Sequence, residues 1–256
     1  MKPKPNGLFV AFATCAALLV GGEAGAVIQG QPSGLTQHTV RIHRGDGKAL
    51  CSGVAIGREH VVTARHCSGR GALSVAAGGE RIRVIGTGVS AIGISVRGDA
   101  IILTLAKPLP PAIAPLTVAE GEGPFVIAGY GTSVERRPSV QGTLHEASLV
   151  HAHGNKLVDP NRSGNISASA CFGDSGGPVV RMGPSGPVLV GVITRASHPH
   201  PRIACGHLTH YAPVFSGDNE PEVTTAAIAD PAERVESPRR KKRVKHVARH
   251  HRYARR

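Results

Sequence analysis

Short apolar runs alternate with clusters of glycine, proline, serine and asparagine from residue 27 to about residue 215. The runs have the length of strands and are rich in β-branched residues, a pattern typical of β-structure. Clear examples are residues 39–42, 53–56, 81–85 and 188–193. No helical stripe of ten or more residues occurs in this stretch. Many short strands with frequent turns predict an all-β fold, either a barrel or a sandwich.

The N-terminal pattern is different and is typical of an export signal. Lys2 and Lys4 precede an apolar run over residues 8–20, and the small residues Ala24-Gly25-Ala26 then form a signal-peptidase site. A single-pass membrane anchor is the alternative, although the apolar run is short for crossing a bilayer. We therefore predict a signal peptide over residues 1–26 and a secreted or periplasmic protein.

The C-terminal pattern indicates disorder. Residues 216–236 are acidic and rich in alanine and proline, and a polybasic run follows them. Neither part carries enough large apolar residues to bury a core. The predicted organisation is a signal peptide (1–26), one folded domain (27–215), and a linker with a basic tail (216–256).

The charge is concentrated in that tail. The last twenty residues hold ten Lys or Arg and no Asp or Glu, so they supply most of the formal net charge of +13. The domain itself is nearly neutral, which argues against a specific nucleic-acid-binding protein. We expect the tail either to be a solvated extension or to attach the protein, in a salt-sensitive manner, to an anionic surface or polymer.

Four cysteines remain once the signal is removed: Cys51, Cys67, Cys171 and Cys205. An even number in an exported chain predicts two disulfides, for which three pairings are possible. A zinc site is the alternative, but the chain contains no Cys-x-x-Cys pair. We expect no metal and no cofactor.

Two segments carry candidate acid–base groups. His66 follows the apolar run 61–64, and a histidine at a strand end is rigidly held yet accessible, as a general base requires. Asp99 precedes the strongly apolar run 100–105. A carboxylate beside a buried strand needs a partner, and a histidine is a suitable one. Taken singly, each residue also has an ordinary structural interpretation.

The third segment is Gly173-Asp174-Ser175-Gly176-Gly177-Pro178. Glycines on both sides of Ser175 allow a sharp turn and a close approach to a substrate. The N–H groups of Gly173 and Ser175 can then point at one spot and stabilise an oxyanion. A glycine-rich hairpin that happens to contain a serine is the alternative.

This motif, preceded by Thr63-Ala64-Arg65-His66-Cys67, resembles the trypsin/chymotrypsin-like serine protease family. The order His, Asp, Ser along the chain is also that of the family. The resemblance covers residues 27 to about 214 and implies two six-stranded antiparallel Greek-key barrels. It further implies a catalytic triad of His66, Asp99 and Ser175.

The resemblance also assigns supporting roles. It implies the disulfides Cys51–Cys67 and Cys171–Cys205. Cleavage after Ala26 would expose Val27-Ile28-Gln29-Gly30, which is similar to the family's activated N-terminus. We therefore expect the new ammonium group of Val27 to pair with Asp174 and shape the oxyanion hole, with no separate propeptide.

Substrate preference follows from the residues that correspond to the family's specificity pocket: Ser169, Thr194, Ala196 and Thr209. The absence of a carboxylate at the base argues against Arg or Lys at P1, the substrate residue before the scissile bond. Small or medium apolar P1 residues are expected instead. Two departures from the family pattern are that Arg195 replaces the usual aromatic residue and that no closing helix is visible after Phe215.

The sequence therefore predicts a serine endopeptidase that forms an acyl-enzyme intermediate and acts on protein or peptide substrates. The alternative is a non-catalytic binding protein that keeps the protease fold and attaches to anionic surfaces through its basic tail.

Overall fold

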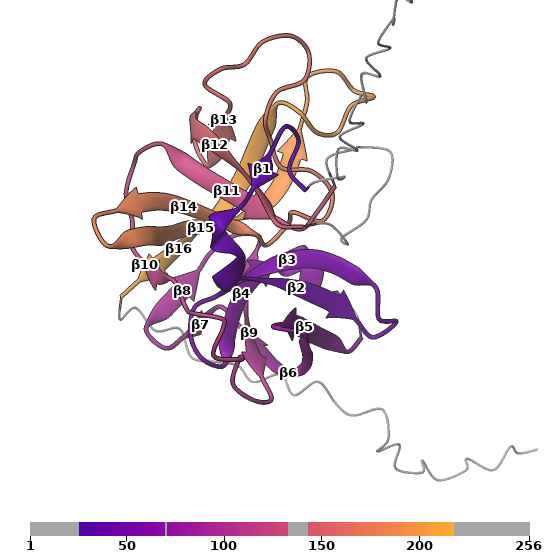
Figure 1. The fold of residues 1–256 in the computed structure, drawn as a ribbon, viewed down its shortest axis with the longest axis vertical. Helices are drawn as coiled ribbons and strands as arrows, with labels where there is room; N and C mark the ends of the chain where they lie inside the picture. Colours follow the sequence, from indigo (N-terminus) through magenta and orange to yellow (C-terminus); the bar gives the residue numbers. More distant parts are fainter. Residues whose placement is uncertain (1–25, 70, 133–142, 218–256) are drawn as a thin grey trace, which may run out of the picture.

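The computed structural model describes residues 26–69, 71–132 and 143–217. Nearly all of the predicted signal peptide, and the linker and tail from residue 218, lie outside these residues. Figure 1 shows two lobes, each built from strands, with β2 to β6 and β9 in one lobe and β11 to β16 in the other. No helix among the described residues is long and apolar enough to span a membrane.

The first lobe is a closed antiparallel barrel with the strand order β2-β3-β4-β9-β6-β5. In β5 and β6, buried positions alternate with more exposed ones, because one face points into the barrel and the other toward solvent. In β6, for example, Ile82 and Val84 are buried, whereas Arg83 and Ile85 are exposed. The six strands are β2 (Thr39–Arg44), β3 (Ala49–Ala55), β4 (His60–Ala64), β5 (Leu73–Ala77), β6 (Glu80–Gly88) and β9 (Ala100–Leu105).

The second lobe is also a ring of six antiparallel strands within the described residues. Its order is β15-β14-β11-β12-β13-β16, and pairing of β15 with β16 closes the ring. The expected pair of six-stranded antiparallel barrels is therefore confirmed. The strands are β11 (Phe125–Gly129), β12 (His145–His151), β13 (Lys156–Val158), β14 (Pro178–Gly183), β15 (Gly186–Ser197) and β16 (Leu208–Ser216).

Short elements connect and extend the two barrels. Strand β16 continues beyond its barrel to pair with β8, which follows the first barrel's β6 in the chain. Strand β10 adds to β15 in parallel, and β1 pairs with β12. These elements are β1 (Gln31–Pro32), β7 (Ser90–Ala91), β8 (Ile94–Val96), β10 (Thr117–Val118), and the 3₁₀ helices η1 (Gly34–Gln37) and η2 (Arg65–Ser68).

Each barrel has its own aliphatic core, and a third cluster joins them. The joining cluster contains Val62 and Ile102 from the first barrel and Leu189 and Val192 from the second. The packing of the two barrels therefore fixes the residues at their junction, and His66, Asp99 and Ser175 lie near it.

We predict that Leu103→Ala lowers the free energy of unfolding by about 2–5 kcal/mol, because it leaves a cavity in the first core. Leu103 is fully buried in the middle of β9, which pairs with both β4 and β6. Urea-induced unfolding measures the change. The control is Met182→Ala, at a side chain that is 64% exposed, for which we expect less than about 0.5 kcal/mol. Equal effects of the two substitutions would contradict this description of the core.

Candidate active site

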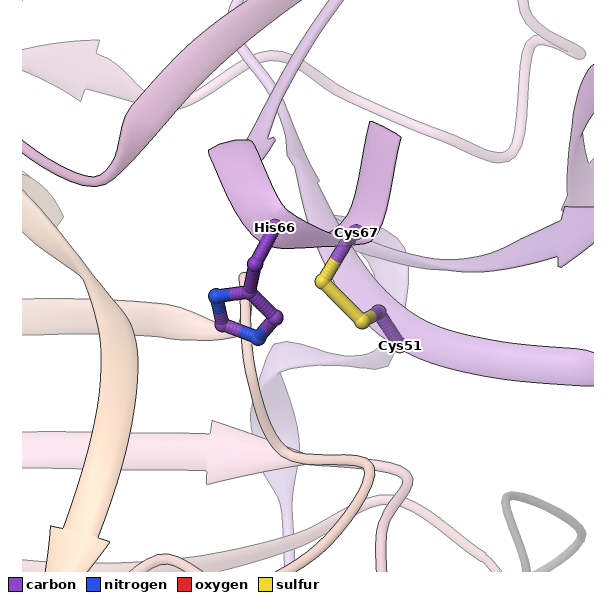
Figure 2. A group of neighbouring side chains, drawn as sticks. All are labelled: Cys51, His66 and Cys67. Carbon is purple, nitrogen blue, oxygen red and sulfur yellow. A yellow bond between two sulfur atoms is a disulfide. The ribbon is translucent and has the colours of Figure 1, made fainter. Parts of the chain in front are cut away.

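His66 is held by the end of β4 and by a disulfide. Strand β4 leads directly into η2, which contains both His66 and Cys67. Cys67 is bonded to Cys51 of β3, so one of the implied disulfides is confirmed. Figure 2 shows the imidazole ring extending from this turn beside the disulfide. The two sulfurs are bonded to each other and provide no thiolate, so this group of side chains does not form a metal site.

Asp99 is brought to His66 by strand pairing. It immediately precedes β9, and β9 pairs with β4 so that Ala100 lies opposite Ala64. The carboxylate accepts two hydrogen bonds, from His66 Nδ1 at 2.7 Å and from the His66 backbone N–H at 3.1 Å. With its proton on Nδ1, the neutral ring leaves Nε2 free to accept a proton.

The position of Asp99 beside a buried strand predicted a buried carboxylate, but the side chain is partly exposed. The exposed fraction is 43% for the Asp99 side chain and 48% for the His66 side chain. The reason is local, since Asp99 lies in the turn before β9 while the buried positions begin at Ala100. The orientation of the imidazole therefore depends on the two hydrogen bonds rather than on enclosure of the carboxylate.

Ser175 lies in a tight loop that contacts the first barrel. Its carbonyl accepts a hydrogen bond from the backbone N–H of Ser52 at 2.9 Å, and Ser52 Oγ donates to the carbonyl of Gly173 at 3.0 Å. Gly176 has a φ of +82°, and a Cβ there would collide with Thr63 and with the backbone of Ser52. Glycine at position 176 therefore allows the loop to approach the strands that hold His66.

The three candidate residues border one cleft of about 1980 Å³. The Ser175 hydroxyl donates to the carbonyl of Thr194 over 3.4 Å, and the described residues include no hydrogen bond between Ser175 Oγ and His66. Bonds of this kind are often long or misaligned without substrate and tighten when the substrate binds. The structure thus gathers His66, Asp99 and Ser175 in one place, with the His–Asp contact fully formed.

Two backbone N–H groups beside Ser175 are available to a ligand. Within the described part of the chain, the N–H groups of Gly173 and Ser175 donate to no protein acceptor. Gly173 has a φ of +91°, which glycine adopts readily. Free donors next to a nucleophile are what stabilisation of an oxyanion requires.

Asp174 is fully buried, and its carboxyl group organises the loop from inside. It accepts hydrogen bonds from the N–H groups of Gly131 and Cys171, each at 2.8 Å, and from the backbone N–H of Val27. Burial raises the pKa of Asp174 to about 7, and the three donors act in the opposite direction. Val27 and Asp174, the predicted partners, are therefore in contact. In the uncleaved chain the donor is the peptide N–H of Val27 rather than an ammonium group.

The predicted pocket residues have two different environments. Thr194 and Ala196 border the cleft, as do Ala204 and the confirmed disulfide Cys171–Cys205. Ser169 and Thr209 are fully buried and are not among the residues that line the cleft. Their hydroxyls bind backbone groups, because Ser169 Oγ accepts from Gly206 N–H at 2.7 Å and Thr209 Oγ1 accepts from Ala170 N–H at 2.9 Å.

Two supporting residues were missed by the sequence analysis. Ser52 connects the first barrel to the Ser175 loop, and its hydroxyl also accepts from the N–H of Tyr130 at 2.9 Å. Gly131 donates to Asp174, and a Cβ at Gly131 would collide with that carboxyl group. The glycines on both sides of Tyr130 were a usable signal, since they indicate a close backbone approach. Ser52 carried no comparable signal.

Two antiparallel barrels with a histidine, an aspartate and a serine at their junction define the chymotrypsin-like class of fold. A comparison with known families agrees, because the sequence model described as Trypsin matches residues 27–216. The match covers most of the chain, which therefore belongs to the trypsin family.

We predict that Asp174 makes the stability of the uncleaved chain depend on pH. Its folded-state pKa of about 7 lies above the ordinary value of 3.8, so between these values the folded chain keeps a proton that the unfolded chain releases. The contribution of the protonated Asp174 carboxyl group to the free energy of unfolding is fully present below pH 3.8 and is lost as the pH rises toward 7.

Urea-induced unfolding at a series of pH values tests this prediction against Asp174→Asn, which removes the titration. Relative to that variant, the free energy of unfolding of the uncleaved chain should fall between about pH 4 and pH 7, by a few kcal/mol at most. A relative stability that rises with pH over this range would contradict the assignment.

Proposed function

We propose that the chain is an exported serine endopeptidase that uses Ser175, His66 and Asp99 as a catalytic triad. The observation that carries this proposal is the 2.7 Å hydrogen bond between Asp99 and His66 Nδ1, in the cleft that Ser175 also borders. The bond orients the ring and leaves Nε2 as the basic atom. Membership of the trypsin family supports the same chemistry.

In the proposed reaction, Ser175 Oγ attacks the scissile carbonyl carbon while His66 Nε2 takes the hydroxyl proton. The negative charge moves to the carbonyl oxygen, which the free N–H groups of Gly173 and Ser175 bind. When the intermediate collapses, His66 gives the proton to the leaving amine. A water molecule, deprotonated in turn by His66, then hydrolyses the acyl-enzyme and restores Ser175.

We further propose that export completes the site. Removal of residues 1–26 would convert the N–H of Val27 into an ammonium group next to the Asp174 carboxyl group, which it already contacts. An opposite charge at this distance favours the ionised carboxylate and lowers its pKa. The new ion pair would hold the loop that carries Gly173 and Ser175 in its active form.

The pocket favours small or medium apolar P1 residues. Ala196, Ala204 and the Cys171–Cys205 disulfide provide an apolar lining beside Ser175. Ser169 supplies no carboxylate to attract Arg or Lys, and its hydroxyl is occupied by backbone groups.

The signal-peptide prediction and the two disulfides support a secreted or periplasmic location. The alternative of a non-catalytic binding protein attached through its tail is weaker, because such proteins usually lack a triad residue and this chain retains all three. The basic tail remains a proposed contact to an anionic surface.

Ser175→Ala and His66→Ala should each lower the kcat of peptide hydrolysis by about 10⁴-fold or more, because nucleophile and base act as a unit. Cleavage of a library of internally quenched peptides by the secreted protein measures this loss. The matched control is Ser148→Ala, at an exposed serine on β12 outside the cleft, which should retain full activity. Unchanged hydrolysis in Ser175→Ala would overturn the proposed function.

Cleavage after Ala26 should give a secreted protein whose first residue is Val27, and N-terminal sequencing checks this directly. A protein made with one extra alanine before Val27 should lose at least about 100-fold in kcat/KM, because its ammonium group no longer reaches Asp174. Asp174→Asn should show a comparable loss. A different natural first residue, or full activity with the extra alanine, would contradict this mode of activation.

A further inference from the structure

A row of basic side chains crosses three neighbouring strands of the second barrel. Lys156 of β13 lies directly opposite His210 of β16, and His210 lies directly opposite Arg195 of β15. Directly opposed residues project from the same face of a sheet. The next row, which includes Leu157 and Thr209, is buried inside the barrel, so the basic row is on the outer face.

The Arg195 end of this row lies at the cleft that Ser175 also borders. Arg195 and His210 both border the cleft, and Arg195 is exposed. Arg195 also directly follows Thr194, whose carbonyl accepts the hydroxyl of Ser175. The basic row therefore begins within one residue of a group that contacts the proposed nucleophile.

Neither end of the row has a counterion among the described residues, because no described carboxylate forms an ion pair with Arg195 or with Lys156. Lys156 Nζ instead contacts His153 Nε2 at 3.0 Å, and His210 Nε2 contacts Ser197 Oγ at 2.8 Å. Burial, followed by the charges of Arg195, Lys156 and His153, lowers the pKa of His210.

Arg195 and Lys156 lie on the two strands that flank β16, on either side of His210. An anion bound at Arg195 would therefore meet the positive charge of both side chains. The cleft gives access to this position, because Arg195 and His210 both border it.

We propose that Arg195, with His210 and Lys156 behind it, forms a subsite for an acidic side chain of the substrate. This inference rests on the proposed function. Ala196, a predicted P1-pocket residue, is in register with Thr209, whereas Arg195 is in register with His210, so the side chains of Ala196 and Arg195 lie on opposite faces of β15. The acidic residue would then precede P1 by one to three positions. The enzyme would select an acidic residue close to a small or medium apolar P1 residue.

Peptide pairs that differ only by Glu or Gln at one of these three positions test the subsite, each with Ala at P1. The secreted protein should cleave the Glu peptide with about three- to ten-fold higher kcat/KM at one position. Arg195→Gln should bring this ratio close to one, and Arg195→Glu should make a Lys peptide the better substrate. Arg83→Gln, at an exposed arginine on β6 outside the cleft, is the matched control and should keep the ratio.

A Glu/Gln ratio of one at all three positions, or a ratio that persists in Arg195→Gln, overturns the subsite. Fluorescence anisotropy with Ser175→Ala separates this result from failure of the proposed function, because it measures binding of the same labelled peptides without catalysis. Tighter binding of the Glu peptide to Ser175→Ala, lost when Arg195→Gln is added, supports the subsite even if no peptide is cleaved. Equal binding of both peptides, or binding of neither, overturns it.

Discussion

The burial of the Asp174 carboxyl group is the constraint on which the arrangement of the site depends. A carboxyl group without solvent needs hydrogen-bond donors, and Asp174 takes them from Gly131, Cys171 and Val27. These donors come from the segment just after β11, from the disulfide-bonded segment before Ser175, and from the beginning of the domain. One buried group thus joins the segment before Ser175 to the backbone of Gly131 and to that of Val27.

The site also requires that the Ser175 loop of the second barrel be held against the first barrel. Ser52 of β3 provides this contact, because its backbone N–H donates to the carbonyl of Ser175 and its hydroxyl donates to the carbonyl of Gly173. The same hydroxyl accepts a hydrogen bond from the N–H of Tyr130. Pairing of β4 with β9 separately brings His66 to Asp99. The proposed base and nucleophile are therefore positioned by interactions that do not involve each other, which is compatible with the lack of a hydrogen bond between Ser175 Oγ and His66 among the described residues.

Much of this could be predicted from the sequence because the signals were local. The strand pattern gave an all-β fold, the motifs around His66 and Ser175 gave the family, and the family gave both disulfides. Features that depend on strand register could not be predicted, because a shift of one residue moves each side chain to the other face. The row of Lys156, His210 and Arg195 is one example. The buried state of Ser169 and Thr209 is another, since their hydroxyls bind backbone groups that sequence offsets do not reveal.

The most direct test of the account is covalent labelling of the secreted protein with a fluorophosphonate, followed by mass spectrometry of the modified peptide. This reagent reacts with an activated serine and requires no knowledge of the natural substrate. The account predicts one equivalent of label, located on Ser175, and none on Ser175→Ala. Folded, correctly processed protein that takes up no label, or that carries the label on another residue, would contradict the assignment of Ser175 as the nucleophile.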